Sequence, residues 1–359
     1  MNTNTENRGA VYCNEDVWSI FESNLQALQP SSIFVLTDTN TEKLCLPYFL
    51  GKIQPTIQWE VLQIPVGESH KNITTCLQLW SALSEKGADR KSLLINLGGG
   101  VVTDLGGFVA CTFKRGIEFI NIPTSLLAMV DASVGGKNGV DLGHIKNQVG
   151  LIKDPYSVLI DTHFLLTLPE EEVISGFAEM LKHGLISSED YWNRVALFDV
   201  SKTTEAAKLI WESVEIKQKV VAEDPFEKGH RKTLNYGHTL GHAIESHCLT
   251  SAEKKALLHG EAIAIGMILA TYISSEMIGF PKEKLDQIAR TILKHFEKIS
   301  FAKNEIDAII ALLKFDKKNA NGKVLFVLLK DIGNCKIDCE VTNDLLYKAF
   351  EYYENLKKY

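Results

Sequence analysis

The chain has 359 residues, of which 45% are hydrophobic and 23% are charged. This composition is typical of soluble globular proteins and excludes a disordered, collagen-like or disulfide-scaffold chain, while the length predicts two domains at roughly 150 residues each. The formal net charge is −7, from 45 acidic and 38 basic residues, and no long run of lysine or arginine is present, which argues against nucleic acid as a partner.

Three further features bear on where the protein resides. Residues 1–10 are polar and lack the apolar centre of a signal peptide. The most apolar helical segment, residues 262–273, is expected to be too short to span a bilayer, which takes about 20 residues. The seven cysteines are an odd number with no C-x-x-C pair, so we expect reduced thiols and a cytoplasmic protein that does not engage a membrane.

The first half of the chain alternates short β-branched runs with helical stretches, a pattern that predicts a mostly parallel sheet covered by helices. In such sheets, ligands bind beyond the carboxyl ends of the strands, so the residues that follow each strand are the first candidates for a site. The predicted strands are residues 33–37, 59–64, 92–97, 118–122 and 158–160.

After Leu168-Pro169 the pattern changes, and we place a domain boundary there. Residues 170–314 are almost continuously amphipathic, with short breaks near residues 224–229, 249–253 and 279–281, and predict a mainly helical domain. The apolar run 323–329 is expected to form a small hairpin with residues 335–339.

The third predicted strand runs into Gly98-Gly99-Gly100-Val101-Val102-Thr103-Asp104, followed by helical spacing. Glycines let the backbone approach a bulky anion, and a helix amino terminus offers free N–H groups, so this turn suits a dinucleotide pyrophosphate. Its spacing is neither G-x-G-x-x-G nor a Walker loop, and a tight turn without a ligand remains the alternative. Glu68, in the turn 67–71 after another strand, is a candidate for binding ribose hydroxyls.

Residues 123–138 form a second glycine-rich segment after a strand, which we expect to be one loop. It combines hydroxyl groups with Asp131, paired glycines and Lys137, and Lys146-Asn147 would extend it. These residues suit an anionic, polyhydroxylated ligand.

Six of the ten histidines lie between residues 183 and 259, which suggests a metal site. His238 and His242 are four apart on a predicted helix and share a face, so spacing alone favours this pair as zinc ligands. Glu179 and His259 are candidates for the remaining ligands. The basic residues Lys182, Lys217, Arg231 and Arg115 would suit a substrate with both a carboxylate and a phosphate.

Together these motifs closely resemble the 3-dehydroquinate synthases, a family of sugar-phosphate cyclases, and the resemblance extends from about residue 37 to 330. It rests on the segments GGGVVTD at 98–104, IPTSLLAMVD at 122–131, GGK at 135–137, LNYGHTLGHAIE at 234–245 and LHGE at 258–261. Ile145 departs from the family, which commonly has glycine there, and Ser125 stands where threonine is common.

The resemblance implies a lyase that converts 3-deoxy-D-arabino-heptulosonate 7-phosphate to 3-dehydroquinate and phosphate, the second step of the shikimate pathway to chorismate and the aromatic amino acids. NAD would oxidise a ring hydroxyl and be regenerated after phosphate elimination, and a divalent metal, zinc or cobalt, would assist. It also implies a Rossmann-like NAD-binding domain at 1–168, a mainly helical metal- and substrate-binding domain at 169–359, an active site in the cleft between them, and a homodimer.

Carried over by position, the resemblance replaces the spacing-based metal pair with Glu179, His238 and His259. Asp131 and Lys182 would orient hydroxyl groups, while Lys217 and Arg231 would bind the substrate carboxylate. Around the phosphate it places Lys137, Asn147, Asn235, His242, Arg115 from a second subunit, and one of Lys317 and Lys318. The implied NAD contacts are Asp38, Asn40, Glu68, Lys71, Gly99, Gly100, Val101, Asp104, Thr124, Ser125, Lys137, Lys146 and the turn from Phe164 to Thr167.

Three alternatives differ in substrate or class. Related cyclases act on sedoheptulose 7-phosphate or glucose 6-phosphate, but the cations Lys217 and Arg231 favour a substrate that carries a carboxylate. A metal-dependent polyol dehydrogenase would release NADH, and it does not explain the excess of anion-binding residues. A catalytically inactive NAD-binding regulator would have lost a metal ligand, whereas Glu179, His238 and His259 are all present.

Overall fold

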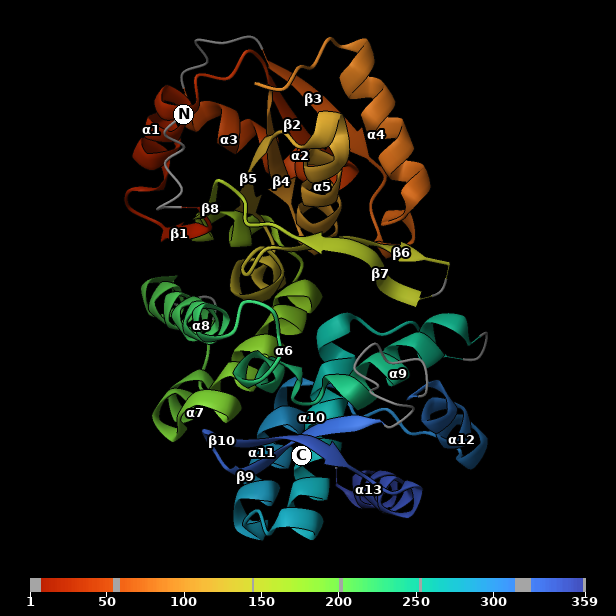
Figure 1. The fold of residues 1–359 in the computed structure, drawn as a ribbon. Helices are drawn as coiled ribbons and strands as arrows, with labels where there is room; N and C mark the ends of the chain where they lie inside the picture. Colours follow the sequence, from red (N-terminus) through yellow and green to blue (C-terminus); the bar gives the residue numbers. More distant parts are fainter. Residues whose placement is uncertain are drawn as a thin grey trace. The chain divides into compact units, whose positions relative to one another are not determined.

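A computed structural model of the chain describes residues 8–53, 59–143, 145–199, 203–251, 254–313 and 324–357 (Figure 1). The chain divides into two compact units. Unit 1 comprises Met1–Val173 with Thr203–Val214, and unit 2 comprises Ile174–Lys202 with Glu215–Tyr359.

Unit 1 is built on a six-stranded sheet with the order β1-β8-β5-β4-β2-β3, in which every pair is parallel. The chain leaves β2 for β3 on one side and then crosses to β4 on the other side, so the topological switch point lies between β2 and β4. The strands are β1 (Ala10–Cys13), β2 (Ile33–Asp38), β3 (Trp59–Ile64), β4 (Leu93–Gly98), β5 (Glu118–Pro123) and β8 (Ser157–Ile160).

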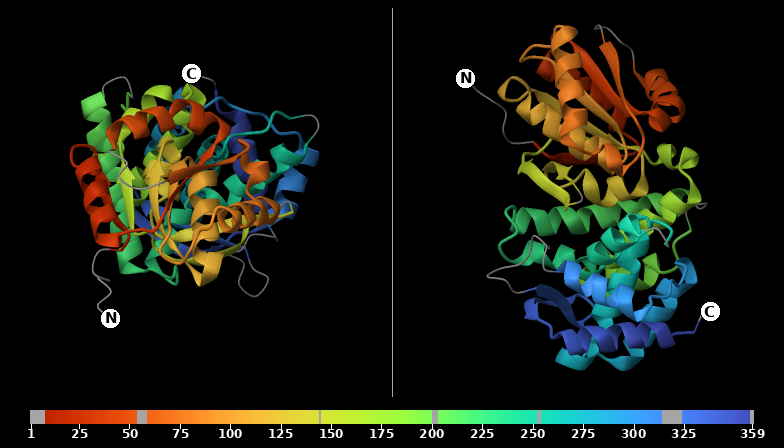
Figure 2. Two further views of the ribbon diagram at one scale, coloured as in Figure 1. Left: turned by 90° about the horizontal axis from the view of Figure 1, so that it is seen from above. Right: turned by 90° about the vertical axis from the view of Figure 1, so that its right-hand side faces the viewer.

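Helices cover both faces of this sheet (Figures 1 and 2). On one face, Phe34 and Leu36 of β2 pack with apolar residues of α4 and α5 in a single core cluster. Their alternation along β2 follows the two-residue period of a strand. The helices of this unit are α1 (Val17–Leu28), α2 (Thr39–Leu44), α3 (Leu46–Lys52), α4 (Ile73–Glu85) and α5 (Gly100–Thr112), with 3₁₀ turns η1 (Glu68–His70), η2 (Phe113–Arg115) and η4 (Thr162–Thr167).

The prediction that residues 123–138 form one loop is wrong. Residues Ala128–Ala132 form a helical turn, η3, and Lys137 begins strand β6 (Lys137–Leu142). That strand pairs in antiparallel fashion with β7 (Ile145–Ile152), which sequence analysis also missed, as it missed β1. Gly107 lets α5 pack closely against β6, because a Cβ there would lie 1.8 Å from Oδ1 of the Asn138 side chain and would displace it.

Unit 2 is mainly helical, as predicted. The predicted breaks near residues 224–229, 249–253 and 279–281 each separate two helices or helical turns. Its helices are the greater part of α6 (Glu170–Ser187), α7 (Glu189–Val195), the later part of α8 (Thr203–Glu223), the turn η5 (His230–Asn235), α9 (His238–Thr250), α10 (His259–Ile278), α11 (Lys282–His295), α12 (Lys303–Leu312) and α13 (Asn343–Asn355).

The predicted hairpin near the end of the chain is present. Strand β9 (Leu325–Asp331) pairs in antiparallel fashion with β10 (Asn334–Glu340). Figure 2 shows the hairpin and α13, all in dark blue, at the end of unit 2.

Helix α10 corrects the expectation that the most apolar helix is too short to span a membrane. It has 20 residues and is long and apolar enough for a span, although 67% of its most apolar window is buried inside the protein. Residues Ala262–Ala270 are all buried, so the helix lies in the core of unit 2, where α9, α11, α13 and β9 pack against it.

Candidate metal centre and nucleotide-binding loops

Three helices of unit 2 bring one carboxylate and two imidazoles together. Glu179 lies in α6, His238 is the first residue of α9, and His259 is the first residue of α10. Oε1 of Glu179 is 3.3 Å from Nε2 of His238 and 3.6 Å from Nε2 of His259. One oxygen and two nitrogen atoms therefore converge on one point, as in catalytic zinc sites.

Glycines set the separation of these helices. A Cβ on Gly260 would lie 1.9 Å from the backbone oxygen of Ser175, so only glycine lets the start of α10 pack against α6. A Cβ on Gly266 would lie 2.1 Å from the backbone oxygen of Gly237, which brings α10 equally close to the start of α9. Gly237 also has φ of 77°, a conformation that strongly favours glycine. The glycines of the GHTLGH and HGE segments thus hold the histidines and Glu179 together.

The two oxygens of Glu179 have different environments. Oε2 accepts a hydrogen bond from Lys182, one turn further along α6, and both side chains are fully buried. Oε1 is also buried, and within the described residues it accepts no hydrogen bond. Burial by itself raises the pKa of Glu179, but the charges of Lys182 and His238 outweigh this effect and hold the pKa well below its usual value. Glu179 is therefore an anion with one oxygen available to a cation.

The two histidines are oriented through their other ring nitrogens. Nδ1 of His238 is 3.1 Å from the backbone oxygen of Tyr236, and Nδ1 of His259 is 3.3 Å from Oε2 of Glu245. Burial lowers the pKa of His259, but the charges of Glu245 and Glu179 and the hydrogen bond with Glu245 raise it overall to about 9. Sequence analysis missed this role for Glu245, although its position seven residues after His238 places it on the same face of α9.

His242 belongs to the same cluster. Its ring centroid is 5.2 Å from that of His238 and 5.7 Å from that of His259, and one ring nitrogen from each of the three histidines lies within 4.8 Å of the others. The structure thus brings together both the pair favoured by spacing and the set carried over from the family. Glu179 is the buried anion of the cluster, which a divalent cation would neutralise.

Three of the residues predicted to bind the substrate's anionic groups lie in α8 and η5: Lys217, Arg231 and Asn235. Lys217 and Arg231 are buried, with 6% and 2% exposure. Arg231 Nη1 donates to the backbone oxygen of Pro225, and Asn235 Nδ2 donates to Glu227 Oε1 over 2.6 Å. Glu227, which has φ of 57°, is a further carboxylate at this site that sequence analysis missed. Lys317 and Lys318 lie outside the described residues.

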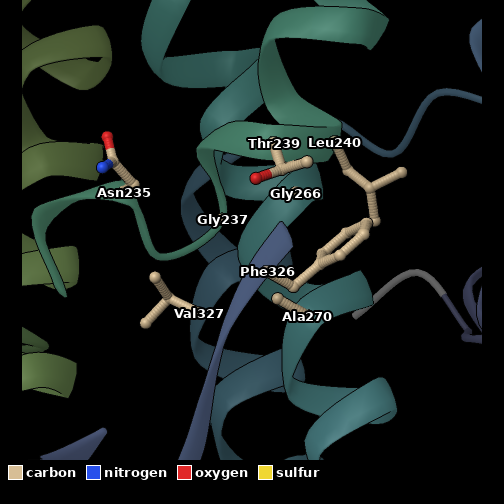
Figure 3. Close-up of a pocket in the computed structure, with 8 residues that line it drawn as sticks. All are labelled: Asn235, Gly237, Thr239, Leu240, Gly266, Ala270, Phe326 and Val327. Carbon is tan, nitrogen blue, oxygen red and sulfur yellow. The ribbon is translucent and has the colours of Figure 1, made fainter. Parts of the chain in front are cut away.

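A small pocket adjoins the metal cluster where α9, α10 and β9 meet. Figure 3 shows Leu240 and Phe326 side by side, while the Asn235 side chain stands apart from them. Because most of its lining is apolar and it includes no charged side chain, this pocket is a packing gap and does not suit an anionic ligand.

In unit 1, the glycine turn lies at the switch point, beyond the end of β4. A Cβ on Gly98 would lie 2.5 Å from Val102, so this glycine serves the turn itself. Gly99 is the N-cap of α5, and within the described residues no side chain caps this helix. Thr124 donates its N–H to the backbone oxygen of Gly98, and Ser125 Oγ lies beside Gly99. The predicted residues Gly99, Gly100, Val101, Thr124 and Ser125 thus surround one helix amino terminus.

A buried ionic network lies beside the same helix. Lys71, only 4% exposed, donates through Nζ to Asp104 Oδ2 over 2.7 Å and to Asn147 Oδ1 over 2.6 Å. Lys146 Nζ is 3.3 Å from Glu68 Oε1, which is 3.9 Å from Lys71 Nζ. Burial raises the pKa of Asp104 despite the opposing charge of Lys71. The structure therefore places four residues that were predicted to bind NAD in one network with Asn147, which was predicted to bind phosphate.

Two other predicted NAD segments have structural roles of their own. The Asp38 carboxylate caps α2 by accepting the N–H groups of Asn40 and Thr41. The Phe164 ring is 2% exposed and packs against Trp18 and Tyr48, and Thr167 Oγ1 donates to the Phe164 backbone oxygen. Asn40 is exposed.

The other residues of unit 1 that were predicted to contact substrate lie in three different elements. Asp131 is half-buried in η3, and Lys137 is exposed at the start of β6. Arg115 is exposed, has φ of 70°, and lines a surface pocket with Asp89, Arg90 and Lys114.

Proteins of known structure share this architecture. A solved structure of 2-deoxy-scyllo-inosose synthase, in complex with carbaglucose-6-phosphate, NAD⁺ and Co²⁺, is 26% identical with a TM-score of 0.81 and covers 95% of this chain and 96% of its own. In class, the chain is a sugar-phosphate cyclase. Residues 61–175 match the 3-dehydroquinate synthase N-terminal family and residues 176–319 the C-terminal family.

Two curated relatives agree with these matches. A 3-dehydroquinate synthase of Parabacteroides distasonis is 42% identical over 345 residues, covering 96% of this chain and 97% of the relative. A 3-dehydroquinate synthase of a Nitratiruptor species is 36% identical over 343 residues, covering 95% and 97%. The chain belongs to the 3-dehydroquinate synthase family, and the resemblance found in the sequence is confirmed.

Proposed function

We propose that the chain converts 3-deoxy-D-arabino-heptulosonate 7-phosphate to 3-dehydroquinate and phosphate, as a phosphate-eliminating lyase. The observation that carries this proposal is the buried Glu179 oxygen that faces the Nε2 atoms of His238 and His259 at 3.3 and 3.6 Å. A Lewis acid at such a point would assist the oxidation of a substrate hydroxyl, and the donor set suits zinc or cobalt.

Glu179, His238 and His259 would hold the metal, which supplies polarisation of the hydroxyl that is oxidised. Lys182, held by the second oxygen of Glu179, and Asp131 orient the substrate hydroxyls. Because Lys182 is buried beside the ligand carboxylate, it also balances the negative charge of Glu179 before the substrate arrives.

The anionic groups of the substrate are assigned by burial and charge. Lys217 and Arg231 bind the carboxylate, because both are buried cations and the planar guanidinium of Arg231 matches a carboxylate in a two-pronged geometry. The phosphate is bound by Lys137, Asn147, Asn235, His242 and Arg115, the last from a second subunit of a homodimer. This division favours the heptulosonate over sugar phosphates that lack a carboxylate.

NAD binds to unit 1 at the switch point between β2 and β4. The pyrophosphate lies at the amino terminus of α5, on the turn Gly99–Gly100, and the network of Glu68, Lys71, Asp104 and Lys146 surrounds the ribose groups. Asp38 and Asn40 lie at the end of β2, and the Phe164 turn contributes its backbone, because the Phe164 ring is buried.

The sequence of steps is redox-neutral. When bound, NAD would supply reversible hydride transfer at carbon C5, whose hydroxyl loses a proton as the carbon becomes a ketone. This ketone acidifies the C6 proton, which allows phosphate to leave. After the C5 ketone is reduced again, the opened ring closes by an intramolecular aldol reaction. In this proposal residues 1–168 are the NAD-binding domain, residues 169–359 bind metal and substrate, and the enzyme acts in the cytoplasm.

The test is to incubate the purified chain with the heptulosonate phosphate, catalytic NAD⁺ and Zn²⁺ while following released phosphate and absorbance at 340 nm. We expect one phosphate per substrate consumed and no net NADH. Accumulation of NADH from glycerol without phosphate release would instead identify a polyol dehydrogenase and refute the proposal.

A further inference from the structure

One face of α9 carries a carboxylate with no role in the reaction described above. His238, His242 and Glu245 are spaced at i, i+4 and i+7, so all three lie along the same side of the helix. Glu245 is only 5% exposed, and its Oε2 is 3.3 Å from Nδ1 of His259 on α10. A carboxylate buried to this degree needs partners that favour its charged form.

The two nitrogens of His259 face different carboxylates. Nε2 is 3.6 Å from Oε1 of Glu179, while Nδ1 is 3.3 Å from Oε2 of Glu245. A neutral imidazole carries one N–H, and a metal ligand must present a bare nitrogen to the ion. Because the Glu245 carboxylate accepts a hydrogen bond, the proton belongs on Nδ1 and the bare nitrogen on Nε2. Glu245 itself contacts the side of the ring away from Glu179, so it is not a metal ligand.

We propose that Glu245 is a positioning residue for the metal centre: it accepts the Nδ1 proton of His259, holds the ring with Nε2 toward Glu179, and strengthens the hold of His259 on the metal. The proposal rests on the metal site of the proposed function. Its physical basis is that an anionic acceptor fixes the tautomer and increases the electron density that the imidazole offers to a metal.

The other histidine ligand has a different neighbour at Nδ1. Nδ1 of His238 faces the backbone oxygen of Tyr236 at 3.1 Å, and a neutral carbonyl orients a ring with less effect on its basicity. The two imidazoles are therefore unequal, and His259 is the stronger donor. A substitution at Glu245 should weaken metal binding through His259 while His238 keeps its orientation.

The test compares Glu245→Gln with Glu305→Gln in the full chain, using Co²⁺ as the probe. Glu305 is a matched control because it is also a largely buried carboxylate beside a histidine of α9, with Oε1 3.6 Å from His247 Nε2. We measure Co²⁺ affinity by competition with a chelator and record the visible spectrum of the Co²⁺ protein, both without substrate.

We expect Glu245→Gln to lower Co²⁺ affinity about 10- to 100-fold and to alter the Co²⁺ bands, because removal of such an acceptor has effects of this size. Glu245→Asp, which keeps the charge, should recover part of the affinity, and Glu305→Gln should match the parent. Parental affinity and spectrum in Glu245→Gln would overturn the proposal. So would an equal loss in Glu305→Gln, because the effect would then be one of general stability.

If Glu245→Gln does not fold, the parent protein still provides a test. With ¹⁵N-labelled histidine and bound Zn²⁺, long-range ¹H–¹⁵N spectra should show His259 protonated at Nδ1 and metal-bound at Nε2, and the opposite arrangement would overturn the proposal. These readouts do not involve turnover. If the parent protein releases no phosphate but Glu245→Gln weakens Co²⁺ binding, the proposed reaction is refuted and the positioning role stands. If the parent releases phosphate but Glu245→Gln binds Co²⁺ like the parent, the positioning role is refuted and the reaction stands.

Discussion

Gly260→Ala tests whether the metal site depends on how closely α10 approaches α6. The new Cβ would lie 1.9 Å from the Ser175 backbone oxygen, whereas real Cβ atoms essentially never approach within 3.0 Å. The start of α10 must therefore move away by at least about 1.1 Å, and the hydrogen bond from the Gly260 N–H to Ser175 Oγ weakens. His259 precedes this residue, so its Nε2 moves away from Glu179.

Overpacking of this kind costs about 1–3 kcal/mol of folding free energy. A displacement near 1 Å at a reacting centre costs about 10²-fold in rate. We expect both losses in Gly260→Ala, together with at least a tenfold fall in Co²⁺ affinity, measured by urea denaturation, phosphate release and chelator competition. Gly51→Ala is the control, because a Cβ at Gly51 has nothing within 4 Å. The reasoning would be refuted if Gly260→Ala bound Co²⁺ as tightly as Gly51→Ala.

Two further predictions concern charge. The His259 pKa is raised from 6.5 to about 9, so protonation of His259 stabilises the metal-free protein fully below pH 6.5, and this contribution is lost as pH rises through about 9. Urea denaturation of the metal-free protein should show that loss of stability, and Co²⁺ affinity should rise over the same pH range. A stability that does not change with pH in this range would contradict the prediction. Lys71→Met removes the cation between Asp104 and Asn147, so we expect it to lower the free energy of unfolding, measured by urea denaturation, by about 3–5 kcal/mol and to weaken NAD⁺ binding, measured by titration. The control Lys86→Met removes a surface ion pair with Glu60 and should lower the free energy of unfolding by less than about 1 kcal/mol. Equal losses in the two variants would argue against the buried network.

Sequence analysis predicted the central strands well because each is a short, mostly apolar run that ends at a turn residue. It missed β6 and β7 for a physical reason. Lys137–Leu142 contains glycine, asparagine and aspartate, whose intrinsic preference is for turns. Pairing with β7 and packing against α5 override that preference, and neither contact is visible in the local sequence.

The site was predictable to the extent that its residues share a helix or a family motif. The spacing of His238 and His242 placed two imidazoles on one face, with Glu179 and His259 as candidates for the remaining ligands. The resemblance then selected Glu179, His238 and His259 as the set. The contact between Glu245 and His259 joins two helices, so its identification required the fold. The need for glycine at position 260 likewise arises from a neighbour that is remote in sequence, Ser175.

The arrangement of Glu179 also bears on which cations the centre accepts. Because Lys182 occupies Oε2, the carboxylate can offer a metal only Oε1 and so acts as a monodentate ligand. Ca²⁺ favours six to eight oxygen ligands, often with bidentate carboxylates, and Mg²⁺ favours an octahedral oxygen shell. One oxygen and two imidazole nitrogens suit borderline-soft ions of low coordination number instead. We therefore expect the lysine one turn along α6 to disfavour binding of the alkaline-earth ions Mg²⁺ and Ca²⁺ at this centre.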